Sequence, residues 1–350
     1  MSKMIRLLIC AAALGALIAS TAAGVKKSNK LRQNEAAPGA GDQAVLWRDP
    51  GDIRSRNLYF GPGGKAHAPH SVFTFIQEDL HGTSPKIDVR DENGVKWRVK
   101  LGAEARPETV ATRLVWAVGY STNEDYFLPV LRVRGLPPHL HRGQNLIGPG
   151  GTIRNARLKR YSKDEKKIGQ WPWRGNRFAG TKELEGLRVM MALINNWDLK
   201  DNNNAVYDGR FSGGSPPREK EEEVYAVSDL GASFGTTGRS WTRTISKGNL
   251  HSFERSKFIT KVTGAYVDFS TPSRPGLIDL FNPPEFISRL RLRWIGKRIP
   301  RADVRWITQE LNQLSPEQIQ DAFRAAGYSP EEVEGFSQVI EHRIGELSEL

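Results

Sequence analysis

The sequence predicts an α+β fold in two lobes, an N-terminal antiparallel β lobe with one helix and a mainly helical C-terminal lobe. Three observations predict it. Short β-branched and aromatic runs fill residues 56–160, an apolar helical pattern follows at 181–196, and two helix starts lie near the C-terminus. We therefore expect the N-lobe to span 56–160 and the C-lobe 161–350. A chain of 350 residues is long enough to bury a sizeable core.

The first elements expected are three antiparallel strands. Residues 72–76 and 87–90 are rich in β-branched and aromatic side chains, and residues 95–101 alternate between polar and apolar. A glycine-containing turn at 81–86 joins the first pair, and an Asn-Gly turn at 91–94 joins the second pair. The pattern predicts a three-strand meander.

A single helix is expected next, opened by Pro107 and closed by Gly119. Apolar residues at helical spacing form one face of this helix: Val110, Leu114 and Val118. Two further strand-like runs, 126–133 and 152–158, complete the N-lobe.

The C-lobe is predicted from helix caps. Thr181 precedes an apolar helix that runs to about Asn196. Ser315-Pro316-Glu317 and Ser329-Pro330-Glu331 each place a capping residue before proline at the first helical position. We therefore expect helices to dominate this half.

The N-terminus has the pattern of a secretory signal peptide, residues 1–23. Lys3 and Arg6 precede the apolar run 7–19, and small residues follow at 20–23. The run is shorter than the ~20 residues that span a bilayer, which favours cleavage and export to the periplasm or the medium. The alternative is an uncleaved signal anchor that tethers the protein to a membrane.

Composition narrows the chemistry further. Cys10, the only cysteine, lies inside the predicted signal, so the mature chain would have no disulfide and no cysteine nucleophile or metal ligand. Residues 24–55 lack apolar periodicity and predict a flexible lead-in. The net charge of +12 fits an anionic partner or a solvated basic surface. The basic run 289–293 alternates with leucine, which favours a solvated face over a nucleic-acid partner.

Four short motifs could carry chemistry, and the first is the turn Gly82-Thr83-Ser84. Glycine permits close backbone approach, so N–H groups of this turn could hold phosphate oxygens. Taken alone, an ordinary hairpin turn explains it better.

The second motif pairs Lys100, at the end of a strand, with Glu108, in the first turn of the next helix. An ammonium on a strand can neutralise nucleotide phosphates, and an opposed carboxylate can fix its side chain. The alternatives are a solvated lysine and a glutamate that complements the helix dipole.

The third motif is the polar stretch 195–204. A carboxylate at Asp198 could take or orient the proton of an attacking hydroxyl, and the amide of Asn203 could bind a divalent cation. The rival is an Asn/Asp-rich turn, since the glycine and terminal glutamate of an EF-hand loop are absent. The fourth motif, Asp229-Leu230-Gly231, puts a carboxylate at a strand end, where Mg²⁺ could bind it.

Together the four motifs occur in the order found in protein kinases. The stretch from Asp198 through Lys200 to Asn203 resembles the kinase catalytic loop, and Asp229-Leu230-Gly231 resembles the metal-binding Asp-Phe-Gly. The short spacing from Lys100 to Glu108 resembles the atypical branch that includes HipA-type toxin kinases and phosphatidylinositol kinases. In that branch a helix with Glu and Leu leads to a closing Gly, as at Glu108, Leu114 and Gly119 here.

The resemblance implies a two-lobed protein-kinase-like fold with ATP and Mg between the lobes. It implies that Asp198 and Lys200 are catalytic and that Asn203 and Asp229 bind metal. The nucleotide would be held by the turn and the strand pair: Gly82, Thr83, Ser84, Lys100 and Glu108. A full Gly-x-Gly-x-x-Gly loop is missing from the sequence, and no activation-segment signature follows Gly231.

The sequence thus predicts an exported kinase-like phosphotransferase that acts on a hydroxyl of a protein, glycan or lipid. One alternative is a pseudokinase-like module that binds a ligand or partner without turnover, and another is an exported structural protein with no nucleotide site. His139 and His141 have no evident third metal ligand. Trp171 and Trp173 could stack a sugar or base, but packing beneath a loop is favoured.

Overall fold

The computed structural model describes residues 43–82, 84–162, 165–208, 222–235, 247–270 and 291–350. The predicted signal peptide, Thr83 and part of the predicted lead-in lie outside these residues. Residues Gln43–Leu350 form one compact unit.

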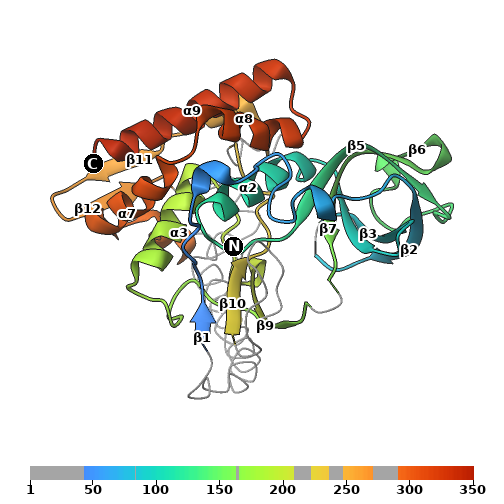
Figure 1. Cartoon of the computed structure of the whole chain (residues 1–350), viewed down its shortest axis with the longest axis horizontal. Helices are drawn as coiled ribbons and strands as arrows, with labels where there is room; N and C mark the ends of the chain where they lie inside the picture. Colours follow the sequence, from blue (N-terminus) through green and yellow to red (C-terminus); the bar gives the residue numbers. More distant parts are fainter. Residues whose placement is uncertain (1–42, 83, 163–164, 209–221, 236–246, 271–290) are drawn as a thin grey trace, which may run out of the picture. The chain divides into compact units, whose positions relative to one another are not determined.

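The first half forms a sheet that closes on itself (Figure 1). The strands follow the order β4-β3-β2-β5-β7, β4 pairs antiparallel with β7 as well as with β3, and β6 extends the edge. Their bounds are β2 Phe73–Asp79, β3 Lys86–Asp91, β4 Lys96–Leu101, β5 Asp125–Arg134, β6 Ile147–Gly148 and β7 Thr152–Arg160. The predicted meander is confirmed, while the closure through β4 and β7 was not predicted.

Alternate residues of these strands fill the inside of the closed sheet, since side chains alternate between the two faces of a strand. On β4 the inward residues are Trp97, Val99 and Leu101, all nearly inaccessible to solvent. The indole nitrogen of Trp97 donates to Asp91 at 2.9 Å, so its one polar atom is satisfied. The other face of β4 is left for polar side chains.

The helix predicted from Pro107 is α2, Ala105–Ala117, which begins two residues earlier than expected. Its apolar residues, among them Val110 and Leu114, belong to the core of the C-terminal helices and not to the interior of the closed sheet. Figure 1 shows α2 beside α8, with which it is in contact. This helix therefore links the two halves of the described unit.

The predicted capping residues begin three of the helices in the C-terminal half. Thr181 accepts a hydrogen bond from Leu184 at the start of α3, and Ser315 and Ser329 form capping boxes at α8 and α9. In the described residues of this half the α-helices are α3 Lys182–Leu193, α4 Leu250–Glu254, α7 Arg301–Leu311, α8 Pro316–Ala325 and α9 Pro330–Ser348.

Strands are more frequent in the second half than the sequence indicated, so "mainly helical" describes it incompletely. One sheet has the order β1-β10-β9-β8 and another β11-β12-β13. Their bounds are β1 Gln43–Val45, β8 Lys167–Gly169, β9 Asn204–Asp208, β10 Glu222–Val227, β11 Ile259–Val262, β12 Tyr266–Phe269 and β13 Ile299–Pro300. The antiparallel pair β9–β10 carries two of the predicted motifs at its open end.

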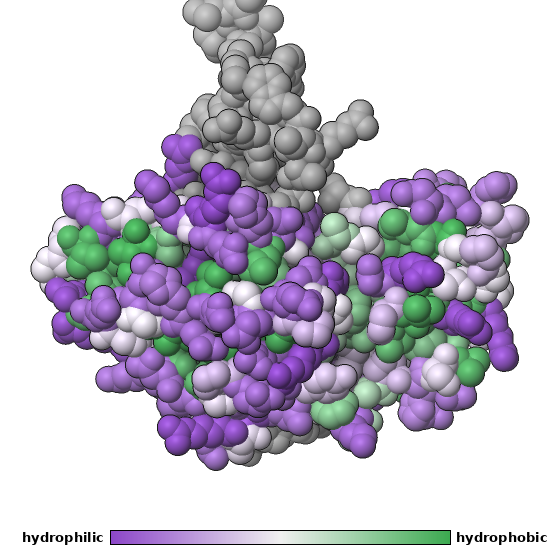
Figure 2. Space-filling view, turned by 90° about the horizontal axis from the view of Figure 1, so that it is seen from above, coloured by the Kyte–Doolittle hydropathy of each residue, from purple (hydrophilic) through white to green (hydrophobic). Residues whose placement is uncertain are grey.

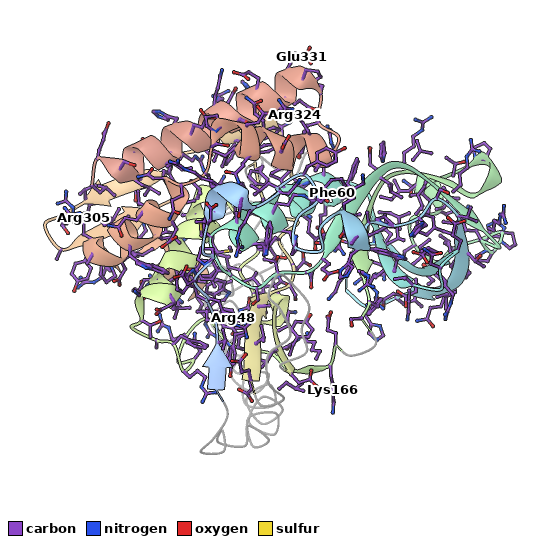
Figure 3. The ribbon with its side chains drawn as sticks, viewed as in Figure 1. Arg48, Phe60, Lys166, Arg305, Arg324 and Glu331 are labelled. Carbon is purple, nitrogen blue, oxygen red and sulfur yellow. The ribbon has the colours of Figure 1, made fainter. Side chains whose placement is uncertain are left out.

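The prediction of a flexible lead-in is wrong for residues 43–55. Strand β1 pairs with β10, and Leu46 and Ile53 are buried in the helical core. Arg48, labelled in Figure 3, forms an ion pair with Glu222 of β10. Isolated apolar residues in a polar stretch gave no periodic pattern from which this docking could be predicted.

The face seen in Figure 2 is mainly hydrophilic, with separate hydrophobic patches. Among the described residues, no helix has both the length and the apolar character needed to span a bilayer.

Candidate active site

Lys100 occupies the polar face of β4, opposite the inward-facing Val99 and Leu101. Its side chain is buried, so the interpretation as a solvated strand lysine is wrong. Its ammonium group lies 2.7 Å from Glu108, 2.9 Å from Glu104 and 3.1 Å from Asp229. Burial disfavours its charge, but the nearby Glu108, Asp229 and Glu104 outweigh burial and raise the pKa of Lys100. The lysine is therefore a fixed positive charge.

Glu108 is held from a second side by Arg157. The two residues lie 2.6 Å apart, and Arg157 pairs in register with Lys100 on the neighbouring strand β7. The other guanidinium nitrogen of Arg157 is 3.4 Å from Asp125. The basic side chains of Lys100 on β4 and Arg157 on β7 thus hold the Glu108 carboxylate of α2. Glu108 therefore does more than complement the helix dipole.

Glu104 is the hub of the cluster, and the sequence did not predict it. Besides Lys100, it accepts a hydrogen bond from Ser84 at 2.8 Å and forms an ion pair with Lys247. Burial opposes its charge, but Lys100 and Lys247 lower the pKa of Glu104. The carboxylate connects the predicted glycine turn, the strand lysine and a distant part of the chain.

The segment Asp229-Leu230-Gly231 passes directly against Glu104. A Cβ atom at Gly231 would lie 2.8 Å from Cβ of Glu104, closer than side chains tolerate. Glycine is therefore required for this approach. Asp229 itself remains partly exposed, with 42% of its side chain accessible.

The β9–β10 pair brings the third and fourth motifs together. Antiparallel pairing continues beyond Asn204 and Val227, so that Ser228 donates from its backbone to the carbonyl of Asn203 at 2.8 Å. At the other end of the loop, the backbone N–H of Trp197 donates to the carbonyl of Ala232 at 3.1 Å. The predicted catalytic loop is thus bonded at both ends to the segment that contains Asp229.

Hydrogen bonds fix the shape of the loop itself. The side-chain nitrogen of Asn203 donates to the carbonyl of Asp198 at 2.6 Å, and the Asp198 amide donates to Asn196 at 2.9 Å. Lys200 lies 3.4 Å from the Asp198 carboxylate, of which Oδ1 is buried without a hydrogen-bond partner among the described residues. These contacts use the side-chain nitrogen of Asn203 and not its side-chain oxygen.

The predicted phosphate turn is only partly described. Gly82 has a positive φ of 71°, which favours glycine, and its carbonyl accepts a hydrogen bond from Arg142. Ser84 is committed to Glu104. Thr83 lies outside the described residues, so its predicted role is not addressed by the structure.

Two weaker sequence hypotheses can now be judged. Trp171 and Trp173 are both buried in the helical core, so the packing interpretation is confirmed and the stacking platform is wrong. His141 pairs with Glu78 at 3.1 Å. Among the described residues, the one carboxylate or histidine group with metal-ligand geometry is Glu104, Glu108 and Asp229, which contains no histidine.

Sequence reasoning missed Glu104, Arg157 and Lys247. Arg157 lies in the predicted strand 152–158, but the alternation could not show which face met Glu108. Glu104 follows Lys100 by four residues across a strand-to-helix turn, where spacing alone predicts no contact. Lys247 lies far along the chain from its partner, and no local pattern marks it.

No protein-family model matches the chain, and no curated protein matches its sequence. Two solved kinase structures resemble parts of it. The Helicobacter pylori proinflammatory kinase CtkA is 11% identical, with a TM-score of 0.42, and the match covers 79% of this chain and 95% of that chain. The Golgi casein kinase is 10% identical, with a TM-score of 0.33, covering 79% and 74%. At these scores the similarity carries no argument, and function is argued from the site.

Proposed function

We propose that this protein is an exported kinase-like phosphotransferase that binds Mg-ATP and phosphorylates a hydroxyl of a protein, glycan or lipid. The observation that supports it most is that two motifs, separated in sequence, meet at the Lys100 ammonium. Glu108 and Asp229 contact its ammonium at 2.7 Å and 3.1 Å. A chance match of motifs would scatter these residues, which argues against a structural protein without a nucleotide site.

Lys100 supplies the positive charge that nucleotide phosphates need. Glu108 fixes its position, because the carboxylate is buried and is also held by Arg157. A lysine paired in this way to a helix carboxylate is one requirement of phosphoryl transfer in kinases. The resemblance to the HipA-type and phosphatidylinositol kinase branch remains a prediction.

The residues present fit a magnesium ion. Asp229 offers a half-exposed carboxylate, and Asn203, on the adjoining strand end, offers an amide oxygen; hard cations prefer such oxygens. The triad Glu104, Glu108 and Asp229 is a poorer site, because the Lys100 ammonium already contacts all three carboxylates. Bound magnesium would neutralise charge on the phosphates.

Asp198 is the proposed base or orienting group for the acceptor hydroxyl. Its loop is anchored to the Asp229 segment at both ends, and its Oδ1 has no hydrogen-bond partner among the described residues. The ammonium of Lys200 lies 3.4 Å from the same oxygen and forms an ion pair with it.

A pseudokinase-like binding module is the second candidate, and one observation favours it. Glu104 and Asp229 both contact Lys100 where phosphates would otherwise lie. A module that never turns over could keep this arrangement, whereas an enzyme must release Asp229 to the metal.

A thermal-shift titration with ATP and magnesium tests nucleotide binding. At 100 times its dissociation constant, a ligand of the folded state stabilises it by about 2.7 kcal/mol. We expect a magnesium-dependent shift that Asp229→Asn loses and the control Asp321→Asn, on α8, keeps. If the folded wild type does not shift with nucleotide, the proposal fails. If the wild type does bind Mg-ATP, an assay for transfer of labelled phosphate distinguishes an enzyme from a pseudokinase.

A further inference from the structure

The ion-paired residues Lys100, Glu104, Glu108, Asp229 and Lys247 form what we call the Lys100 cluster. A pocket of about 740 Å³ shares Lys247 with this cluster and is otherwise formed by other residues. Its walls come from the start of α2, the β6–β7 hairpin, residues 247–248 and Tyr328. Lys100, Asp198 and Asp229 do not line it. Its volume falls within the range that accommodates small-molecule ligands. We call it the Tyr328 pocket.

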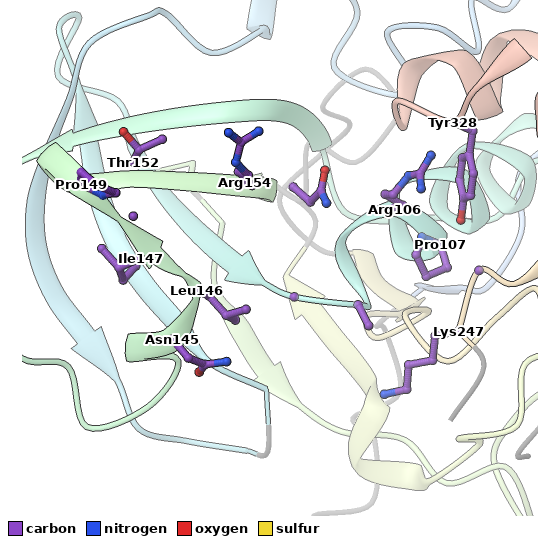
Figure 4. Close-up of a pocket in the computed structure, with 15 residues that line it drawn as sticks. Arg106, Pro107, Asn145, Leu146, Ile147, Pro149, Thr152, Arg154, Lys247 and Tyr328 are labelled. Carbon is purple, nitrogen blue, oxygen red and sulfur yellow. The ribbon is translucent and has the colours of Figure 1, made fainter. Parts of the chain in front are cut away.

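The charged residues that line the Tyr328 pocket are all basic. Arg106, Arg154 and Lys247 line it, and none of its described lining residues is acidic. Figure 4 shows Arg154 on one side of the pocket and Arg106 with Tyr328 on the other. Arg154 is exposed on β7, and a ligand in the pocket could approach it without breaking an ion pair that the structure shows.

Tyr328 gives an independent indication of a ligand. Its side chain is 7% exposed, yet its hydroxyl has no hydrogen-bond partner among the described residues. A buried hydroxyl without a hydrogen-bond partner destabilises the fold, so a ligand that accepts its hydrogen bond is favoured. Burial raises the pKa of Tyr328, so the hydroxyl keeps its proton and can donate to an anion.

The surroundings hold this hydroxyl in place. Arg106 stacks on the Tyr328 ring at 3.8 Å and pairs with Glu332 at 2.9 Å. A Cβ atom at Gly248 would lie 2.2 Å from the hydroxyl oxygen, so only glycine lets the backbone approach. The hydroxyl is thus fixed beside Gly248, which also lines the pocket.

We propose that the Tyr328 pocket binds a phosphate monoester, held by the Tyr328 hydroxyl and the cations Arg154 and Lys247. The inference goes beyond the proposed function, because it adds an anion site that is separate from the Mg-nucleotide. The two sites are linked by Lys247, which also pairs with Glu104 of the Lys100 cluster. An anion in the pocket competes with Glu104 for this ammonium.

Isothermal titration with O-phosphoserine, in the absence of nucleotide and magnesium, tests the proposal. We expect saturable binding that serine does not show. Tyr328→Phe and Arg154→Gln should each weaken it about tenfold, as expected for loss of a hydrogen bond to a charged group. Arg90→Gln, an exposed arginine of β3 outside the pocket, should leave it unchanged.

Further measurements distinguish a free phosphate ester from a phosphorylated protein segment, and the Tyr328 pocket from the site at Lys100. Equal binding of phosphoserine and of a phosphoserine peptide would show that the ester alone suffices, whereas binding of the peptide alone would identify a phosphorylated protein segment. Asp229→Asn should retain phosphoserine binding even if it loses Mg-ATP. Competition by ADP together with loss in Asp229→Asn would place the anion at Lys100 and overturn the proposal. Absence of binding by every phosphate probe, or unchanged affinity in folded Tyr328→Phe and Arg154→Gln, would also overturn it.

Discussion

The ammonium nitrogen of Lys100 lies 2.7 Å from Oε2 of Glu108. This contact joins the closed sheet to α2, whose apolar residues pack in the core of the C-terminal helices. Because α2 contacts α8, a change in the C-terminal helices can reach Lys100 through one helix. The same contact also contributes to the stability of the fold, so substitutions in the site should change the free energy of unfolding.

Lys100→Met should destabilise the protein by about 3–5 kcal/mol, because it leaves buried carboxylates without their cation. Glu108→Gln in the same chain should recover part of this loss by removing one of the uncompensated charges. Denaturant unfolding of the single and double variants measures both effects. Lys261→Met, exposed on β11, should change stability by less than about 0.5 kcal/mol. Equal stability of Lys100→Met and Lys261→Met would contradict the described network.

Gly231→Ala should weaken both the fold and nucleotide binding. The new Cβ would lie 2.8 Å from Cβ of Glu104, which Ser84, Lys100 and Lys247 hold in place. Overpacking of this kind costs about 1–3 kcal/mol. Gly264→Ala is the matched control, since nothing lies within 4 Å of a Cβ there. Thermal unfolding of the two variants measures the difference, and similar melting temperatures would refute the close approach.

The motifs around Gly231 show how far the sequence could predict the site. Lys100, Glu108 and Asp229 could be found because each lies at a strand or helix end where turn residues mark the boundary. Their convergence could be inferred only through the resemblance to kinases. The contact of Glu104 with Lys247 depends on how distant segments pack, which no local pattern encodes.

The fold was predictable to a similar extent. The strands around Val99 and the caps at Thr181, Ser315 and Ser329 follow from alternation and capping chemistry, and all are confirmed. Closure of the sheet depends on pairing of β4 with a strand more than 50 residues away, where periodicity gives no register.

Acid should destabilise the protein partly through Glu104. Its pKa is lowered in the folded state, so it contributes stability above the ordinary value of 4.5, and this contribution is lost as pH falls. Glu104→Gln should therefore show a smaller loss of unfolding free energy between about pH 5 and pH 3. Urea unfolding across this range checks it, with Glu349→Gln at the exposed C-cap of α9 as the control. A Glu104→Gln profile parallel to the wild type would exclude this role.

Export should be visible in the mass of the mature protein. If residues 1–23 act as a signal peptide, expression in a bacterium with a periplasm should yield a chain that begins at residue 24. Replacing Leu8 and Leu14 together by Arg should block processing by breaking the apolar run. Intact-mass measurement of the periplasmic fraction decides the matter, and a full-length chain held in the membrane fraction would support the uncleaved anchor instead.

Asp198 and Asp229 should fail in different ways if their proposed roles are correct. Asp198→Asn keeps the shape and the backbone contacts of the loop but removes the base, so Mg-ATP should still bind while phosphate transfer falls by about 10²–10⁴-fold. Asp229→Asn should instead lose magnesium-dependent binding. Measuring transfer and thermal shift on the same preparations separates the two effects. Should Asp198→Asn transfer phosphate at the wild-type rate, Asp198 is not the base, and a wild type that binds Mg-ATP without any transfer would favour the pseudokinase-like module.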